Sequence, residues 1–94
     1  MDEVDTWTVT VTIGEHDGHT RAVAHLQTRD TGRSGAQRLT GVGFARLAPT
    51  DLDVPEVGAE IAVARALAEL SRSLLHVATE DVEQLTGHSA QLVL

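Results

Sequence analysis

Cysteine is absent from this 94-residue chain, which excludes a disulfide framework, a thiolate metal site and a cysteine nucleophile. No apolar run approaches the roughly 20 residues that a helix needs to span a bilayer, so we expect no membrane segment. The first residues, MDEVD, are acidic and polar, unlike the start of a secretory signal peptide. These absences together favour a cytoplasmic protein.

Basic residues are also scarce: seven arginines and no lysine stand against fourteen acidic residues, giving a formal net charge of −7 at pH 7. Because affinity for phosphate backbones comes mainly from lysine and arginine, this balance weighs against free nucleic acid as a tight partner. The length corresponds to one domain, residues 1–94. Its core is expected to be large enough to fold without disulfides or structural metal ions. Residues 1–5 and about 88–94 are expected to be its tails.

Two segments near the N-terminus have the alternation typical of strands. In residues 6–13, four threonines alternate with apolar residues, which are Trp7, Val9, Val11 and Ile13. In residues 20–28 the inward positions are Ala22, Ala24 and Leu26. The pair Asp17-Gly18 lies between the two segments at a length suited to a hairpin, so the strands should be antiparallel neighbours.

A third strand is expected over residues 38–47, after a loop at residues 29–37. One face of this strand carries Gly41, Gly43 and Ala45. Glycine weakens a strand unless another backbone approaches closely, so we expect a helix to cross at this face.

The longest periodic segment, residues 53–78, predicts that helix. Apolar residues recur there at steps of three or four, which places them on one helical face: Val57, Ile61, Ala64, Leu67, Leu70, Leu74 and Val77. Asp53 and Glu56 form an acidic variant of the capping box at its start. Thr79 is expected to cap a short second helix that ends at Gly87, and a single kinked helix is the alternative.

The order of these elements predicts an α+β domain of the form β-β-β-α-α. A three-stranded antiparallel sheet is covered on one face by the long C-terminal helix, together with the short second helix.

Three motifs occur in the order found in a family of small, functionally uncharacterised bacterial proteins, which this chain resembles over about residues 6–92. The motifs are EHDGHTRA at 15–22, GVGFARL at 41–47 and DVPEVGAEIAVARAL at 53–67. The resemblance implies a fold like that of double-stranded-RNA-binding domains and a layout similar to that of ribosome-hibernation factors. It also implies an association with dormancy or stress. Two departures are a longer loop at residues 29–37 and Ala48 in place of the usual polar residue before Pro49.

The hairpin tip combines carboxylates with imidazoles, which suit a divalent ion, in Glu15, His16, Asp17 and His19. Solvated polar residues at a turn are the alternative interpretation, because further ligands would have to come from elsewhere. We expect neither enzymatic activity nor a cofactor. The candidate nucleophiles Ser71 and Ser73 lie within the helix, and most carboxylates lie in turns or at helix starts.

Any contact with RNA is expected on the sheet rather than on the helix. Double-stranded-RNA readers place cations near a helix N-terminus, whereas this region is acidic, with Asp51, Asp53, Glu56 and Glu60. The remaining candidates for contact with RNA or another partner lie on or beside the sheet face away from the helix: Arg21, Arg38 and Arg46.

A homodimer is predicted because one helix cannot cover both faces of a sheet. The expected interface combines the outer sheet face with the C-terminal tail: Val23, Val42, Phe44, Leu92, Val93 and Leu94. The alternative is that the second helix folds back over Phe44 and the tail is disordered.

The function expected from these features is association. We predict a non-enzymatic cytoplasmic protein whose partner in a stress state is the ribosome or another protein. The alternative is a small metal- or ligand-binding module at residues 15–19.

Overall fold

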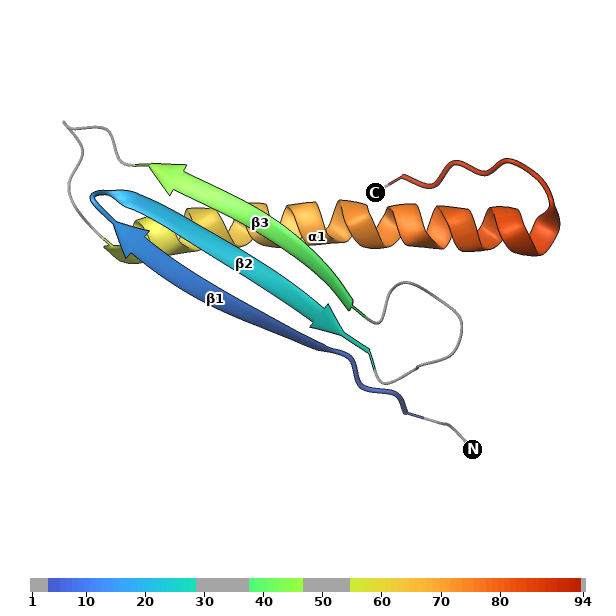
Figure 1. Ribbon diagram of the computed structural model, residues 1–94, viewed down its shortest axis with the longest axis horizontal. Coiled ribbons are helices and arrows are strands. Elements are labelled where there is room, and N and C mark those ends of the chain that lie inside the picture. The colour runs from blue at the N-terminus through green and yellow to red at the C-terminus, as the bar shows by residue number, and fades with distance from the viewer. Residues whose placement is uncertain (1–3, 29–37, 47–54, 94) are drawn as a thin grey trace.

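The structure, a computed structural model, describes residues 4–28, 38–46 and 55–93. Its elements follow in the order β1 (Thr8–His16), β2 (His19–Gln27), β3 (Arg38–Arg46) and α1 (Pro55–Thr86) (Figure 1). The strands form one antiparallel sheet in the order β1-β2-β3, and α1 covers one face. The predicted α+β class, three-stranded antiparallel sheet and long covering helix are therefore confirmed.

The β1–β2 hairpin turns through Asp17 and Gly18, whose φ angles are 51° and 75°. Two positive φ angles in a two-residue loop match the right-handed twist of the flanking strands, and glycine adopts this conformation at little cost. Pairing then runs without interruption from His16 opposite His19 to Thr8 opposite Gln27. The predicted turn is confirmed.

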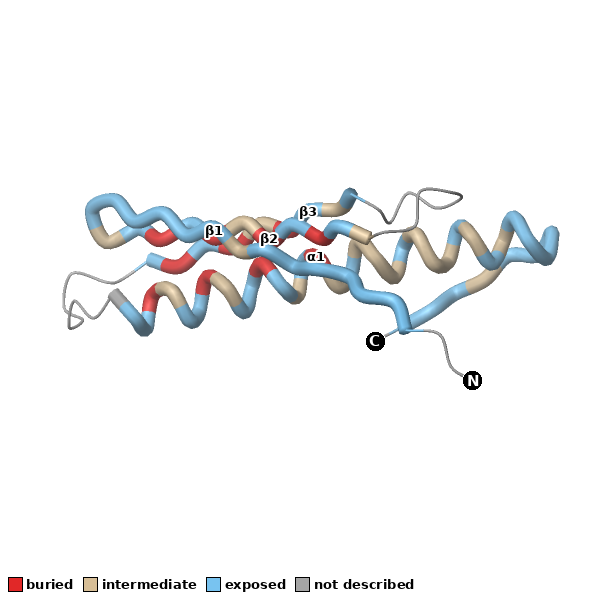
Figure 2. Tube along the Cα trace, turned by 90° about the horizontal axis from the view of Figure 1, so that it is seen from below, coloured by how far each residue is buried: buried red, intermediate tan, exposed pale blue. Residues whose placement is uncertain are grey.

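The core is built almost entirely from small residues where α1 crosses β2 and β3. Its buried members are Ala22, Ala24, Leu26, Ala45, Ala62, Ala66 and Leu70. A Cβ added to Gly43 would meet backbone atoms of Ala62 and Ala66, and one added to Gly41 would meet backbone atoms of Ala66 and Leu70. The predicted crossing at these glycines is therefore confirmed, and Figure 2 shows the buried residues on the facing sides of sheet and helix.

The predicted apolar face of the helix is confirmed at Leu70, which is buried, and at Leu74, which packs against the core, and it is wrong before Leu70. Val57, Ile61 and Leu67 are 43%, 39% and 42% exposed. The residues against the sheet are instead spaced four apart: Gly58, Ala62, Ala66 and Leu70. The physical reason is the close approach at Gly41 and Gly43, which leaves no room for a large side chain between the two backbones.

The predicted break before a second helix is also wrong, because α1 continues without interruption to Thr86. Thr79 does not cap a new helix. Its hydroxyl donates to the carbonyl of Leu75, 2.9 Å away within the same helix. Gly87, with φ of 73°, donates its N–H to the carbonyl of Glu83 at 2.8 Å and ends the helix where predicted.

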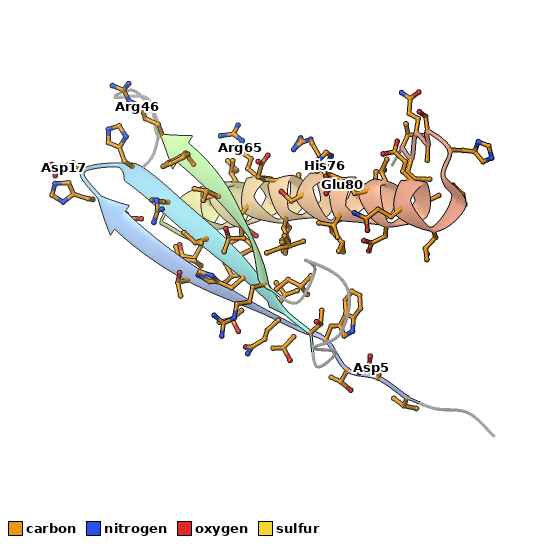
Figure 3. All side chains as sticks on the ribbon, turned by 45° about the vertical axis from the view of Figure 1, so that its right-hand side comes forward. Asp5, Asp17, Arg46, Arg65, His76 and Glu80 are labelled. Atoms are coloured by element: carbon orange, nitrogen blue, oxygen red, sulfur yellow. The ribbon has the colours of Figure 1, made fainter. Side chains whose placement is uncertain are left out.

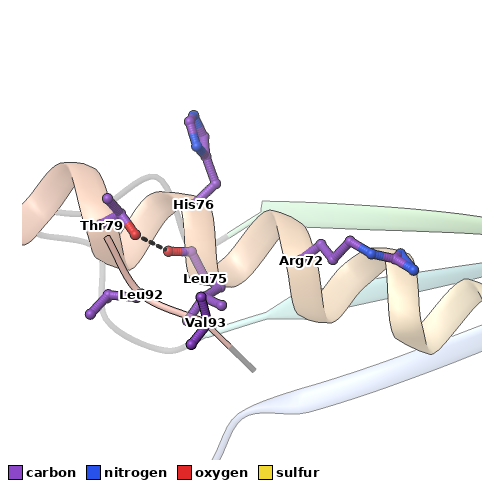
Figure 4. A pocket seen from close by; sticks show the side chains of 6 residues that line it. All are labelled: Arg72, Leu75, His76, Thr79, Leu92 and Val93. Carbon is purple, nitrogen blue, oxygen red and sulfur yellow. Dashed lines mark hydrogen bonds between the residues drawn. The ribbon is translucent and has the colours of Figure 1, made fainter. Parts of the chain in front are cut away.

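The helix is longer than the sheet that it covers. Thirty-two residues at about 1.5 Å each span roughly 48 Å, against roughly 30 Å for a nine-residue strand. The C-terminal segment returns along the overhanging part of α1 (Figure 1). Leu92 and Val93 line a groove of about 330 Å³ together with Leu75 and Thr79 (Figure 4). The tail thus has an intramolecular contact that the sequence did not reveal.

Three predictions fall outside the described residues: the cap at Asp53, the loop at residues 29–37 and the turn at residues 48–52. In the part of the chain that is described, α1 is not apolar enough to cross a membrane.

Candidate functional site

The sheet has an outer face that points away from α1. It consists of the even-numbered residues of β1 and β3 and the odd-numbered residues of β2, because side chains alternate along a strand and the register aligns these positions. One cross-strand row runs through His16, His19 and Arg46, and another through Gly14, Arg21 and Phe44.

The strand positions of the outer face carry basic and imidazole side chains and no Asp or Glu, although Asp17 of the turn lies 3.2 Å from His16. The basic and imidazole side chains are exposed, and they are Arg21, Arg38, Arg46, His16, His19 and His25. The helix has the opposite character, with six acidic residues against two arginines in Pro55–Thr86. Figure 3 shows Arg46 at the end of the sheet that also holds the β1–β2 turn with Asp17. A chain of net charge −7 therefore presents a positive face to solvent.

Phe44 supplies an exposed aromatic side chain on this face, and the residue is 60% accessible. Its strand position is opposite Arg21. Its backbone is held in place because Arg65 of α1 donates to the carbonyl of Phe44 at 2.6 Å. Exposed aromatic rings stack on unpaired bases and arginines neutralise the phosphates between them, so the set has the composition of a single-stranded-RNA surface.

The start of α1 is acidic. Glu56 and Glu60 are exposed there and would repel phosphates. Asp51 and Asp53 lie outside the described residues. Double-stranded-RNA-binding domains contact phosphates through cations at a helix N-terminus. The charges of the described part of this helix do not support that mode of binding.

The candidate metal ligands at the hairpin tip are not brought together. Glu15 points to the helix side of the sheet, whereas His16 and His19 belong to the outer face. The side chains of His16 and Asp17 are 91% and 84% exposed and lie 3.2 Å apart. Among the residues that the structure describes, no three His, Asp or Glu side chains gather closely enough to hold a metal ion.

The residues predicted for a dimer interface form two separate groups. Val23 and Val42 lie opposite each other in the sheet, half-buried, on the outer face with Phe44. Leu92 and Val93 lie against α1 instead, and Leu94 is outside the described residues. A dimer through both groups together stays a prediction.

Sequence reasoning found the three arginines but missed two features of the site. His25 joins the outer face through its strand position, and Arg65 fixes the edge of β3 through Phe44. The first could have been found by tracing the strand alternation across all three strands, which leaves every outward position free of Asp and Glu.

Comparisons with known proteins identify relatives of this chain. The uncharacterised protein Mb1767 of Mycobacterium bovis is 47% identical over 87 residues, which cover 93% of this chain and 86% of that protein. The uncharacterised protein Rv2632c of Mycobacterium tuberculosis is 40% identical over 78 residues, covering 83% of this chain and 77% of that protein. The crystal structure of Rv2632c is similar with a TM-score of 0.77 at 39% identity, covering 93% of this chain and 96% of that chain.

A family model described as Rv2632c-like matches residues 5–91. The small, uncharacterised bacterial family expected from the three motifs is thereby confirmed. The likeness to double-stranded-RNA-binding domains and to hibernation factors stays a prediction. From the span of this match and the identity of its relatives, the chain belongs to the Rv2632c-like family.

Proposed function

We propose that this protein is a non-enzymatic cytoplasmic factor that associates with the ribosome under stress or dormancy, contacting ribosomal RNA through the outer face of its sheet. The observation that carries the proposal is the set of arginines and histidines along the outer face, which also holds the exposed Phe44 and has no Asp or Glu at its strand positions. Phosphates and unstacked bases are the ligands that such a surface recognises.

The ribosome fits the charge distribution better than free RNA does. A net charge of −7 opposes the approach of a bare polyanion, so binding to free RNA should be weak. A ribosomal surface mixes RNA phosphates with basic protein segments. The positive sheet face and the acidic helix of this domain can then each meet complementary charge. The layout similar to hibernation factors, implied by the sequence motifs, points to the same partner.

Sedimentation of the tagged protein with ribosomal particles tests this proposal. We expect co-sedimentation from starved cells and its loss in the double variant Arg38→Ala, Arg46→Ala. Arg72→Ala is the matched control, because Arg72 is an exposed arginine on α1 whose partner is Glu69 at 3.5 Å. Absence of the protein from ribosomal fractions in growth and starvation alike would refute the proposal, as would equal losses in the double variant and the control.

Salt dependence gives an independent measurement of the same contacts. Each phosphate contact contributes roughly 0.7 to the slope of log affinity against log salt for single strands. The variant that lacks Arg38 and Arg46 should therefore show a slope smaller by roughly 1.4. An unchanged slope would mean that these side chains touch no phosphate.

The alternative, a metal- or ligand-binding module at residues 15–19, has less support. Its four candidate side chains are divided between two faces of the sheet and the turn, and His16 is almost fully solvated. Metal binding there would require ligands from elsewhere to complete the coordination.

A further inference from the structure

The two edges of the sheet differ in how they are covered. At the β3 edge, α1 packs closely and Arg65 donates to the outward carbonyl of Phe44. At the β1 edge the helix makes its fewest contacts with the sheet. Figure 1 shows β1 as the outermost strand, which diverges from α1 toward the N-terminal end of the strand. Edge strands left open in this way are sites at which further strands pair.

The hairpin geometry identifies the free backbone groups of β1. His16 and His19 flank the two-residue turn and therefore form a hydrogen-bonded pair, and such pairs recur at every second residue. Thr8, Thr10 and Thr12 thus bond to β2. The N–H and C=O groups of the alternate residues, Val9, Val11 and Ile13, point to the open edge.

The same alternate residues carry the apolar side chains of β1 on the helix side of the sheet. Trp7, Val9 and Ile13 are 49%, 45% and 51% exposed there, because α1 lies over β2 and β3. Within the described residues, backbone groups without a strand partner and uncovered apolar side chains therefore coincide along β1. A single partner strand with its own covering helix would satisfy both.

Nothing in the sequence of this edge blocks such pairing. Residues 6–14 contain no charged residue and no proline, and the register shows no bulge between Thr8 and His16. Natural edge strands are usually protected by one of these devices. Residues 8–13 are instead threonine, valine and isoleucine throughout, all β-branched residues that favour strands.

We propose that β1 pairs antiparallel with β1 of a second copy of this chain, about a two-fold axis perpendicular to the sheet. With the axis at Val11, Val9 lies opposite the partner's Ile13, and about six backbone hydrogen bonds form between hydrogen-bonded pairs. The product is a continuous sheet in the order β3-β2-β1-β1-β2-β3. Both helices lie on the same side and flank the doubled apolar row.

Charge favours a second copy at this strand over a contact that brings the acidic helices of two copies together. Each chain has a net charge of −7, so a contact between copies is least opposed where neither copy presents like charge. The uncharged residues 6–14 provide such a place, and their alternating pattern is complementary to itself under two-fold symmetry. This interface differs from the one predicted from sequence, since it leaves Val23, Val42 and Phe44 uncovered.

Dimerisation at β1 does not depend on RNA binding, because it uses the strand edge and the helix side of the sheet. It does place the two outer faces on one side of the six-stranded sheet. Arg21, Arg38 and Arg46 of both copies then belong to one continuous surface.

Light scattering and amide hydrogen exchange on the intact, unmodified chain test the interface. We expect a dimeric mass at micromolar concentration and slow exchange at Val9, Val11 and Ile13 as well as at Thr10 and its even-numbered neighbours. A monomeric mass overturns the proposal. A dimer in which the odd-numbered amides exchange fast while the even-numbered ones are protected also overturns it, because such a dimer uses another surface.

A pair of charge substitutions provides the matched comparison. Ile13→Lys puts a charge beside the partner's apolar row, and Ile13 is 51% exposed, so the monomer should keep its circular dichroism spectrum. We expect its dimer dissociation constant to rise at least 100-fold. Thr12→Lys adds the same charge to the outer face of the same strand and should remain dimeric. Equal dissociation of both variants, or of neither, would contradict the pairing.

Discussion

Replacing Gly43 by alanine tests the close approach of α1 to the sheet. An added Cβ would meet the carbonyl oxygen of Ala62 and the backbone nitrogen of Ala66, and the same change at Gly41 would meet backbone atoms of Ala66 and Leu70. Backbone atoms of a packed helix cannot rotate away as the end of a long side chain can. The helix must therefore move off β3.

The expected loss of stability depends on how many packed residues move together with the helix. An extra methyl group in a packed core typically costs about 1–3 kcal/mol. We expect Gly43→Ala to lower the free energy of unfolding by about 3 kcal/mol, because moving α1 also loosens the buried Ala62 and Ala66. The Tm should fall by roughly 12–24 °C in a domain of this size. Adding Gly41→Ala should cost less than its separate effect, since both changes displace the same helix.

Chemical denaturation followed by circular dichroism measures these changes, with Gly14→Ala as the matched control. A Cβ added at Gly14 would have no atom within 4 Å. Gly14 also does not have a positive φ angle, so alanine fits its backbone conformation. We therefore expect the control to be neutral or to gain up to about 1 kcal/mol through the unfolded chain. If Gly43→Ala were as stable as Gly14→Ala, the helix would not cross the sheet at β3 as described.

Three further predictions concern the helix face, the outer face and the hairpin tip. Leu70→Ala should cost about 2–5 kcal/mol in the same denaturation assay, whereas Leu67→Ala should cost about 1 kcal/mol or less because Leu67 is 42% exposed; equal costs would restore the apolar face predicted from sequence. Phe44→Ala should weaken ribosome binding in a sedimentation assay by about 1–3 kcal/mol for a stacked base and leave the Tm nearly unchanged. An unaltered affinity would remove this ring from the interface. Added zinc should not raise the Tm, and a zinc-dependent rise that disappears in His16→Ala would instead establish the metal module.

The strands and their crossing point could be predicted because the relevant signals are local. Period-two alternation is visible within a single segment, and Asp17-Gly18 is a short turn signal. Gly41 and Gly43 indicated a close backbone approach without any knowledge of which residues would face them. The structure agrees at each of these points.

The face of the helix could not be predicted in the same way. Hydrophobic periodicity selects the largest apolar residues, and it therefore favoured the stripe through Ile61 and Leu67. The sheet surface requires small residues because its own residues there are glycine and alanine, so Ala62 and Ala66 are buried instead. Only the shape of the sheet, a tertiary property, decides between the two stripes.

The sequence indicated the three arginines of the outer face but not the row in which Arg46 joins the histidines, for a related reason. His16 and His19 are close in the chain, but Arg46 joins their row only through the register of β3 on β2. Summing charges over the whole chain averages this face with the acidic helix. The net charge of the whole chain therefore indicated weak affinity for phosphates.

The separation of charge between sheet and helix makes the domain an electric dipole. At physiological salt the Debye length is about 8 Å, whereas the shortest dimension of the molecule is 21 Å. A polyanion that touches the sheet is therefore largely screened from the carboxylates on the far side of α1. At lower ionic strength the Debye length is longer, so the net charge of −7 repels a polyanion before contact and favours encounters in which the sheet faces it. Lowering the ionic strength should then slow association while strengthening the complex once formed, which is opposite to the kinetic behaviour of a uniformly basic RNA-binding protein.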